Sequence, residues 1–220
     1  MSDDLATQLR AAGVKGVDTF VLKLVQNSGV ATVARDIRSE GLAAWMFAAA
    51  GFSVEMSDSP DLLLSLDGCC LGAEVKHFRL KGQDQVDDAR LRAAPATGFL
   101  VEYGDTMSSE GKAAWDQVVS VADAKAHQYR SDTPNILVIH SSSSHCVGDG
   151  EVRTAANILN ERTVPGGTPP LLALNGLLLM SPEYNVAARR SVYFFELFHV
   201  RQKVASGVVE ALRSIRKWVV

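Results

Sequence analysis

The sequence has few cysteines and no long apolar run. Its three cysteines are Cys146 and the adjacent Cys69 and Cys70, which provide neither a disulfide framework nor a Cys-x-x-Cys pair. His145-Cys146 is too small a group to predict a zinc site. No apolar stretch reaches the roughly eighteen residues of a transmembrane helix, and the N-terminus lacks the apolar core of a signal peptide. We therefore expect a cytoplasmic protein that does not bind membranes.

The chain also lacks an excess of positive charge. Its formal net charge is −3, whereas nonspecific affinity for nucleic acids comes mainly from lysine and arginine. The total charge therefore weighs against a nucleic-acid-binding protein, although the local charge distribution matters more than the total. Neither internal repeats nor a linker divides the 220 residues, and the 47% hydrophobic content suffices for a sizeable core. We predict one domain spanning residues 1–220.

The most informative stretch is a predicted β-hairpin. Two apolar runs, at 62–66 and 69–75, are separated by Asp67-Gly68, a dipeptide preferred in two-residue type I′ loops. Pairing outward from this loop places Asp61 directly opposite Glu74. The hairpin register therefore predicts two carboxylates side by side.

The alternation of side chains assigns these carboxylates to one face of the hairpin. Asp61, Glu74 and Lys76 share this face, while the opposite face is apolar and should pack on the core. Like charges directly opposite each other destabilise a sheet, so we expect a compensating group. A divalent cation such as Mg²⁺, which takes oxygen ligands, would provide it. The predicted core face consists of Leu62, Leu64, Leu66, Cys69, Leu71, Ala73 and Val75.

The spacing of these residues resembles a known nuclease motif. Pro60-Asp61, followed after twelve residues by Glu74-Val75-Lys76, is similar to the PD-(D/E)XK motif of the restriction-endonuclease-like nucleases. The preceding segment, Gly51-Phe52-Ser53-Val54-Glu55, resembles the element that leads into that motif, and the resemblance covers about residues 30–140. It implies an α/β fold with a restriction-endonuclease-like core, in which helices flank a mixed central sheet.

The resemblance also implies roles for the motif residues. Asp61 and Glu74 would bind one or two Mg²⁺ ions, helped by the backbone carbonyl of Val75, and Mn²⁺ would substitute. Lys76 would orient or activate the attacking water and stabilise charge on the phosphate. These roles agree with the general chemistry of metal-ion catalysis. The alternative is a surface hairpin whose acids and lysine pair with each other or face solvent.

Glu40 is a further candidate, near the start of a helix predicted at 39–50. The resemblance implies that a glutamate on this helix reaches the metal site. In the alternative interpretation, Glu40 is an acid favoured by the helix dipole in the first turn, with Ser39 as the N-cap. The sequence leaves both interpretations open.

A helix predicted at 113–129 carries Lys125 and Gln128 on one side, one turn apart. The resemblance implies that a glutamine or lysine from this helix lies beside the scissile phosphate, which makes Gln128 a candidate catalytic residue. We expect Lys125 on a solvated helix face. Both Trp115 and Val119 are predicted on the buried stripe.

The remaining elements are predicted from apolar patterns. Residues 136–139 form a continuous apolar run typical of a buried central strand. Residues 79–112 are polar and could form an insertion or mobile flap beside the site. We predict further strands at 171–180 and 192–200 and helices at 152–161 and 203–218, the last of which carries Arg213, Arg216 and Lys217, either near a phosphate backbone or on a solvated face.

The resemblance implies a Mg²⁺-dependent endonuclease that hydrolyses phosphodiester bonds, with DNA favoured over RNA, in bacterial or phage defence. Cutting both strands of a duplex would require a homodimer or a partner protein. The alternative is a noncatalytic or partner-activated subunit of a defence or nucleic-acid-processing complex. The intact set of Asp61, Glu74 and Lys76 speaks against a noncatalytic relative.

Overall fold

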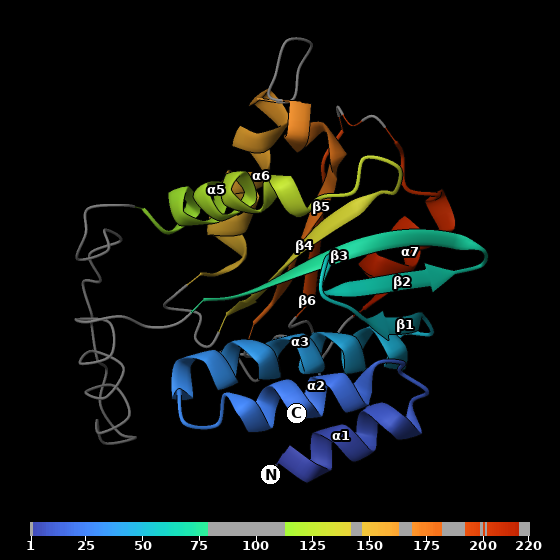
Figure 1. The fold of residues 1–220 in the computed structure, drawn as a ribbon. Coiled ribbons are helices and arrows are strands. Elements are labelled where there is room, and N and C mark those ends of the chain that lie inside the picture. Colours follow the sequence, from blue (N-terminus) through green and yellow to red (C-terminus); the bar gives the residue numbers. More distant parts are fainter. Residues whose placement is uncertain are drawn as a thin grey trace, which may run out of the picture.

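The computed structural model describes residues 2–78, 113–141, 147–162, 169–181, 192–198, 200 and 202–215. They form an α/β fold in which helices flank a six-stranded mixed sheet of order β1-β2-β3-β4-β5-β6 (Figure 1). The strands are β1 (Ser53–Met56), β2 (Leu62–Leu66), β3 (Cys69–Phe78), β4 (Asn135–Ser141), β5 (Leu174–Met180) and β6 (Val192–Glu196). The helices are α1 (Ser2–Ala11), α2 (Val17–Gln26), α3 (Ala31–Ala49), α5 (Ala114–Lys125), α6 (Asp149–Arg162) and α7 (Ser206–Ser214), with 3-10 helices η1 (Ala126–Gln128) and η2 (Pro169–Ala173).

The first three strands form an antiparallel meander with the predicted hairpin register. β2 and β3 pair continuously from the loop to the pair formed by Leu62 and Ala73. Asp67 and Gly68 in the loop have φ angles of 51° and 79°, which are the left-handed conformations that a type I′ turn requires. The ladder stops at Leu62, so Asp61 lies one residue beyond the last pair.

The strand β4 lies inside the sheet, as its apolar sequence predicts. It runs parallel to β3 on one side and to β5 on the other, and all of its residues are buried. Strands covered on both faces need apolar residues at consecutive positions, because neither side of the strand meets water. The strand β6 pairs antiparallel with β5 and completes the described sheet.

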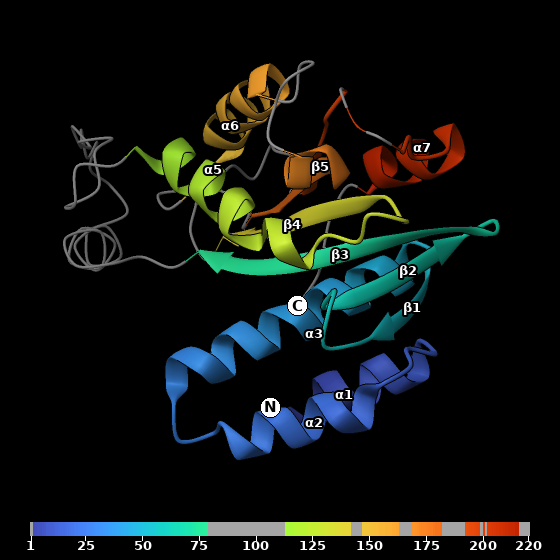
Figure 2. The ribbon, with the colours of Figure 1, turned by 45° about the horizontal axis from the view of Figure 1, so that its top comes forward.

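The sheet separates two apolar clusters. The helices α1, α2 and α3 cover one face, and α5 and α6 cover the other (Figure 2). The predicted apolar face of the hairpin packs in the first cluster, with Leu62, Leu64 and Val75 buried there. Val118, Val119 and Ala122 of α5 are buried in the second cluster. The carboxylate face of the hairpin therefore meets α5.

Several element boundaries differ from the prediction. α3 begins at Ala31, eight residues before the predicted start, and Ile37 in this added part is buried in the first cluster. α5 ends at Lys125 and continues as η1. η2 replaces the start of the predicted strand at 171–180. The predicted helix at 152–161 is confirmed within α6.

The N-terminal helices α1 and α2 were not predicted. The strand β6 and the helix α7 are shorter than expected. The predicted insertion at 79–112, together with Arg216 and Lys217, falls outside the described residues. Among the helices that the structure describes, none combines the length and apolar character that crossing a membrane requires.

Candidate active site

Hydrogen bonds and close packing fix Asp61 where the chain enters β2. The Asp61 carbonyl accepts the N–H of Ser57 at 3.0 Å, and the Ser57 hydroxyl donates to the carbonyl of Pro60. The Pro60 ring packs over Gly72, where an added Cβ would lie 3.0 Å from the proline Cγ. A residue without a side chain at this position of β3 therefore permits the close approach that directs Asp61 toward the sheet.

Beyond the end of the β2–β3 ladder, the Asp61 carboxylate accepts a hydrogen bond from the backbone of β3. Its Oδ2 accepts the backbone N–H of Val75 at 2.7 Å. The N–H and C=O of one strand residue point to the same side of the strand. The Val75 carbonyl therefore faces the same open edge of β3 as the Asp61 carboxylate.

Glu74 is the one acidic side chain among the described residues that is buried, with 1% exposure. Its Oε2 accepts a hydrogen bond from Lys125 Nζ at 2.7 Å, while its buried Oε1 has no hydrogen-bond partner in the described part of the chain. Burial and, next, the negative charge of Asp61 raise the pKa of Glu74 to about 7, against the opposing effect of Lys125. A buried carboxylate oxygen without a donor is costly, so this arrangement favours a further positively charged ligand.

Lys125 joins the two carboxylates, which contradicts its predicted place on a solvated face. Its Nζ lies 2.7 Å from Glu74 and 3.9 Å from Asp61, and its side chain is 23% exposed. The prediction was wrong because Lys125 follows the buried residues Ala122 and Val118 at helical spacing. This spacing was the signal that could have identified Lys125 as a residue facing the sheet.

Glu40 also lies within electrostatic range of the carboxylate pair. Burial raises the pKa of Glu40 to about 7, and the negative charge of Asp61 is the next largest cause. Because α3 begins at Ala31, Glu40 lies in the middle of the helix and Ser39 is not its N-cap. The interpretation of Glu40 as a first-turn acid is therefore wrong, while its predicted proximity to the site agrees with the structure.

Lys23 is a candidate that the sequence analysis missed, because the helix that carries it was not predicted. Its ammonium donates to Asp58 at 2.6 Å, and the nearby charges of Glu40 and Asp61 help to raise its pKa, after the larger effect of Asp58. Lys23, Glu40 and Asp58 line a cavity of about 230 Å³. The signal for α2 was helical spacing of apolar residues at Val17, Phe20, Val21 and Leu24.

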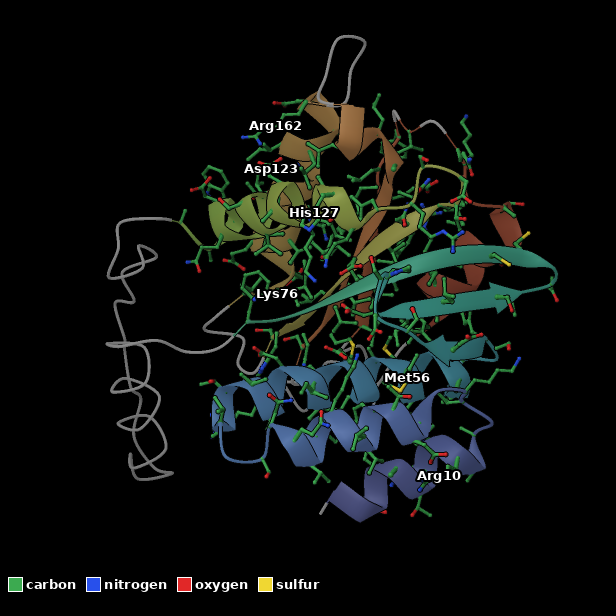
Figure 3. The ribbon with its side chains drawn as sticks, in the orientation of Figure 1. Arg10, Met56, Lys76, Asp123, His127 and Arg162 are labelled. Atoms are coloured by element: carbon green, nitrogen blue, oxygen red, sulfur yellow. The ribbon has the colours of Figure 1, made fainter. Side chains whose placement is uncertain are left out.

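The remaining predicted residues are not bonded to the carboxylate pair. Lys76 lies on β3 next to α5 (Figure 3). It follows Glu74 by two residues and lies on the same face of the strand. Within the described ranges, its side chain forms no hydrogen bond or ion pair. Gln128 lies in η1, and its buried Oε1 has no hydrogen-bond partner there. The side chain of Lys76 is therefore available to an incoming group on the carboxylate face.

The donor atoms fit a divalent cation that also contacts its substrate. Asp61 and Glu74 offer carboxylate oxygens, and the Val75 carbonyl faces the same edge. No three His, Cys, Asp or Glu side chains converge on a metal position in the described ranges, so a closed structural metal site does not fit. Mg²⁺ commonly uses one or two carboxylates together with waters and substrate phosphates, and the unpartnered Glu74 oxygen matches this type of site.

The electrostatic balance of the site is close to neutral. The negative groups are Asp61, Glu74 and Glu40, and the positive groups near them are Lys125 and Lys23. Two of the three acids have a pKa of about 7, so they exchange protons near neutral pH.

Comparison of the chain with protein-family models, curated proteins and solved structures finds no match in any of the three.

Proposed function

We propose that this protein is a metal-dependent nuclease with a restriction-endonuclease-like core, which hydrolyses phosphodiester bonds. The observation that carries the proposal is the Asp61–Glu74 pair, in which a buried Glu74 oxygen lacks a donor among the described residues. The order of elements supports it, because Glu40 on α3 precedes the meander and α5 covers the carboxylate face. The resemblance of the motif alone favours DNA over RNA and a role in bacterial or phage defence.

The roles of the residues follow from their positions. Asp61, Glu74 and the Val75 carbonyl would hold the cation. When bound, Mg²⁺ or Mn²⁺ would stabilise charge on the phosphate as a Lewis acid and lower the pKa of a bound water. Lys76 would stabilise the charge that develops on the phosphate. Glu40, with a pKa of about 7, can accept and return a proton at neutral pH.

The ion pair of Lys125 gives this residue a separate role. Its ammonium neutralises part of the charge of Asp61 and Glu74, and thereby stabilises two neighbouring acids that repel each other. A cation that enters the site would take over this function. Lys125 would then be free to bind a phosphate oxygen of the substrate.

The test is cleavage of supercoiled plasmid, linear duplex, single-stranded DNA and RNA, each with Mg²⁺, Mn²⁺ or EDTA. We expect metal-dependent cleavage that Asp61→Ala and Lys76→Ala each reduce by about a thousandfold, equivalent to about 4 kcal/mol of transition-state stabilisation. Glu55→Gln on β1 is the matched control, because it removes an exposed acid away from the pair. Cleavage that survives in Asp61→Ala would refute the proposed site.

The second candidate function is a noncatalytic or partner-activated subunit of a defence or nucleic-acid-processing complex. The ion pair of Lys125 favours it, because a lysine that permanently balances Asp61 and Glu74 makes a cation unnecessary. The two candidates differ in Lys125→Met. If Lys125 merely stands in for the cation, this variant binds Mn²⁺ more tightly than the wild type, as measured by electron paramagnetic resonance. If the ion pair is permanent, the wild type does not bind Mn²⁺.

A further inference from the structure

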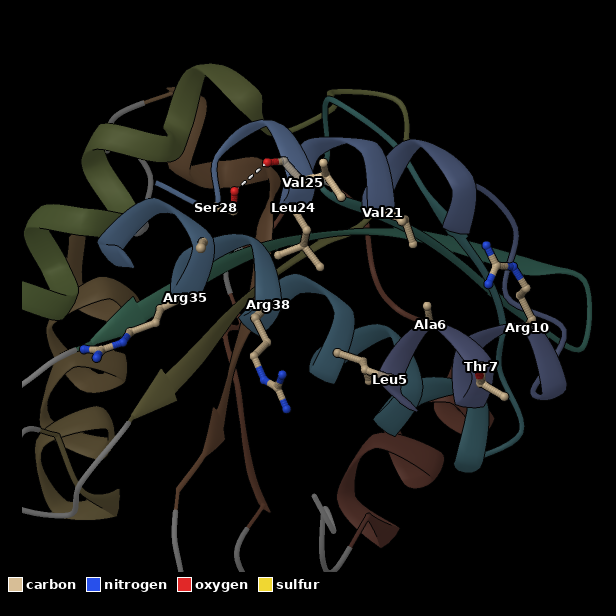
Figure 4. Close-up of a pocket in the computed structure, with 11 residues that line it drawn as sticks. Leu5, Ala6, Thr7, Arg10, Val21, Leu24, Val25, Ser28, Arg35 and Arg38 are labelled. Atoms are coloured by element: carbon tan, nitrogen blue, oxygen red, sulfur yellow. Dashed lines mark hydrogen bonds between the residues drawn. The ribbon is translucent and has the colours of Figure 1, made fainter. Parts of the chain in front are cut away.

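A second cavity lies between α1, α2 and α3 and has a volume of about 680 Å³. This helical groove shares no lining residue with the cavity beside Glu40. Figure 4 shows its lining, with apolar side chains from α1 and α2 and arginines from α1 and α3. The apolar part of the lining includes Leu5, Ala6, Val21, Leu24, Val25 and Ala34.

Exposed apolar residues concentrate beside this helical groove. Of the five large apolar side chains that are exposed in the described part of the chain, four lie between residues 22 and 33. Val25 lines the groove itself and the others belong to the same helix-turn-helix of α2 and α3. Their exposures are 55% for Leu22, 64% for Val25, 52% for Val30 and 38% for Val33. Clustered exposed apolar residues mark binding surfaces more often than isolated ones do.

The charges on the rim of the helical groove have one sign. Its lining contains Arg10, Arg35 and Arg38 and no acidic residue. Arg10 forms an ion pair with Asp18 at 2.7 Å, but within the described ranges no ion pair engages Arg35 or Arg38. The latter two arise from one face of α3, one turn apart (Figure 4). The groove therefore offers two guanidinium groups to carboxylates that are themselves one turn apart.

We propose that the helical groove binds an amphipathic helix of a partner protein that carries acidic residues beside its apolar stripe. Such a helix presents apolar side chains at every third or fourth position to an apolar groove, and its carboxylates would form charge-assisted hydrogen bonds with Arg35 and Arg38. A small amphipathic anion would leave Val30 and Val33, which lie outside the lining, uncovered. A symmetric contact with a second copy would bring like-charged arginine rims together.

The experiment is selection of displayed helical peptides on the full chain, with counter-selection on the Arg35→Glu/Arg38→Glu protein. Enriched peptides are expected to combine helical apolar spacing with flanking Asp or Glu. In fluorescence anisotropy, the charge-reversed protein should bind the enriched peptide at least about tenfold more weakly, or about 1.4 kcal/mol. Val25→Asp should also lose binding. Photocrosslinking from position 25 should label the peptide.

The matched control is Lys203→Glu, which reverses an exposed charge outside the helical groove and should leave binding unchanged. All four altered residues are exposed or partly buried, and thermal melts verify that each variant folds. Selected peptides without acidic residues, or equal binding to the charge-reversed protein, would overturn the proposal. So would saturable binding of dodecyl phosphate that excludes every peptide, or a dimer in sedimentation velocity that Val25→Asp dissociates.

Discussion

Two polar clusters lie on opposite faces of the same strand, β3, and they differ in the side chains that are buried in them. On the α5 face, Glu74 keeps an ionisable carboxylate with one oxygen unpartnered among the described residues. On the α3 face, His77 Nδ1 lies 3.3 Å from Asp36 Oδ1, and its ring stacks on that of His140 with centroids 4.9 Å apart. The first cluster contains carboxylates paired with a lysine, whereas the second contains stacked imidazoles beside one partly exposed carboxylate.

The hydrogen bonds of Ser39 orient the His140 ring. The Ser39 hydroxyl donates to the carbonyl of Arg35 at 2.9 Å, and its oxygen lies 2.8 Å from His140 Nδ1. Since the single hydroxyl hydrogen is used on Arg35, His140 donates from Nδ1 to Ser39. Burial, followed by the nearby His77, lowers the pKa of His140 to about 3. The carboxylates of Asp61 and Glu74 thus lie toward α5, whereas the buried imidazole of His140, with its lowered pKa, lies toward α3.

The largest effect on this comparison should come from Lys125→Met. This variant leaves Glu74 buried without its positive partner, which should cost about 3–5 kcal/mol of unfolding free energy at pH 8. The cost should be smaller at pH 5, where Glu74 is protonated. Urea unfolding at both values of pH measures it. Arg162→Met, which removes an exposed ion pair with Asp123, should cost less than about 1 kcal/mol, and an equal loss for Lys125→Met at both values of pH would contradict the prediction.

On the opposite face, the stability contribution of His140 should have the reverse pH dependence. Its pKa is lowered from 6.5 to about 3, so below pH 6.5 protons bind the unfolded chain more strongly than the folded chain. Stability from this group is present above pH 6.5 and is lost as pH falls toward 3. Between pH 7 and pH 5, the unfolding free energy of the wild type should fall by about 2 kcal/mol relative to His140→Asn.

The exposed His127 provides the control for this measurement. His127→Asn should leave the difference between the two values of pH unchanged. An imidazole of His140 that titrates near pH 6.5 in nuclear magnetic resonance spectra of the folded protein would contradict the lowered pKa.

A smaller effect is expected for the pH dependence of cation binding. Glu74 has a pKa of about 7, so protons compete with the cation below this pH. From pH 6 to pH 8, the affinity for Mn²⁺ should rise about tenfold and then level off. In the metal-free protein, the same raised pKa has the opposite effect on stability, which is lost as pH rises from 4.5 through 7. An affinity for Mn²⁺ that is independent of pH would contradict the role of Glu74 as a ligand of the cation.

The smallest effect should come from Lys23→Ala. Its positive charge lowers the pKa of Glu40, so its removal should shift the midpoint of the pH profile of cleavage upward. The shift should stay below about one unit, because the Lys23 side chain is 36% exposed and solvent screens its charge. Lys203→Ala is the matched control for the loss of an exposed lysine, and equal profiles for the two variants would exclude an influence of Lys23 on the site.

The sequence by itself determined the hairpin and the central strand. The Asp67-Gly68 loop and the two-residue period of the side chains fix the register from 62 to 73 and place Asp61 at its end. These features depend on local backbone sterics, which are set by the residues within each short segment. The continuous apolar run of β4 similarly required burial on both faces.

Only the tertiary structure decided which side chains meet across the sheet. Lys125 reaches Glu74 across 51 residues of sequence, and Ser39 reaches His140 across 101 residues. These contacts depend on how α5 and α3 dock on the two faces of β3, which is set by the packing of complete apolar surfaces. A short sequence pattern contains the spacing within one element, but the position of another element against it arises only when the whole core assembles.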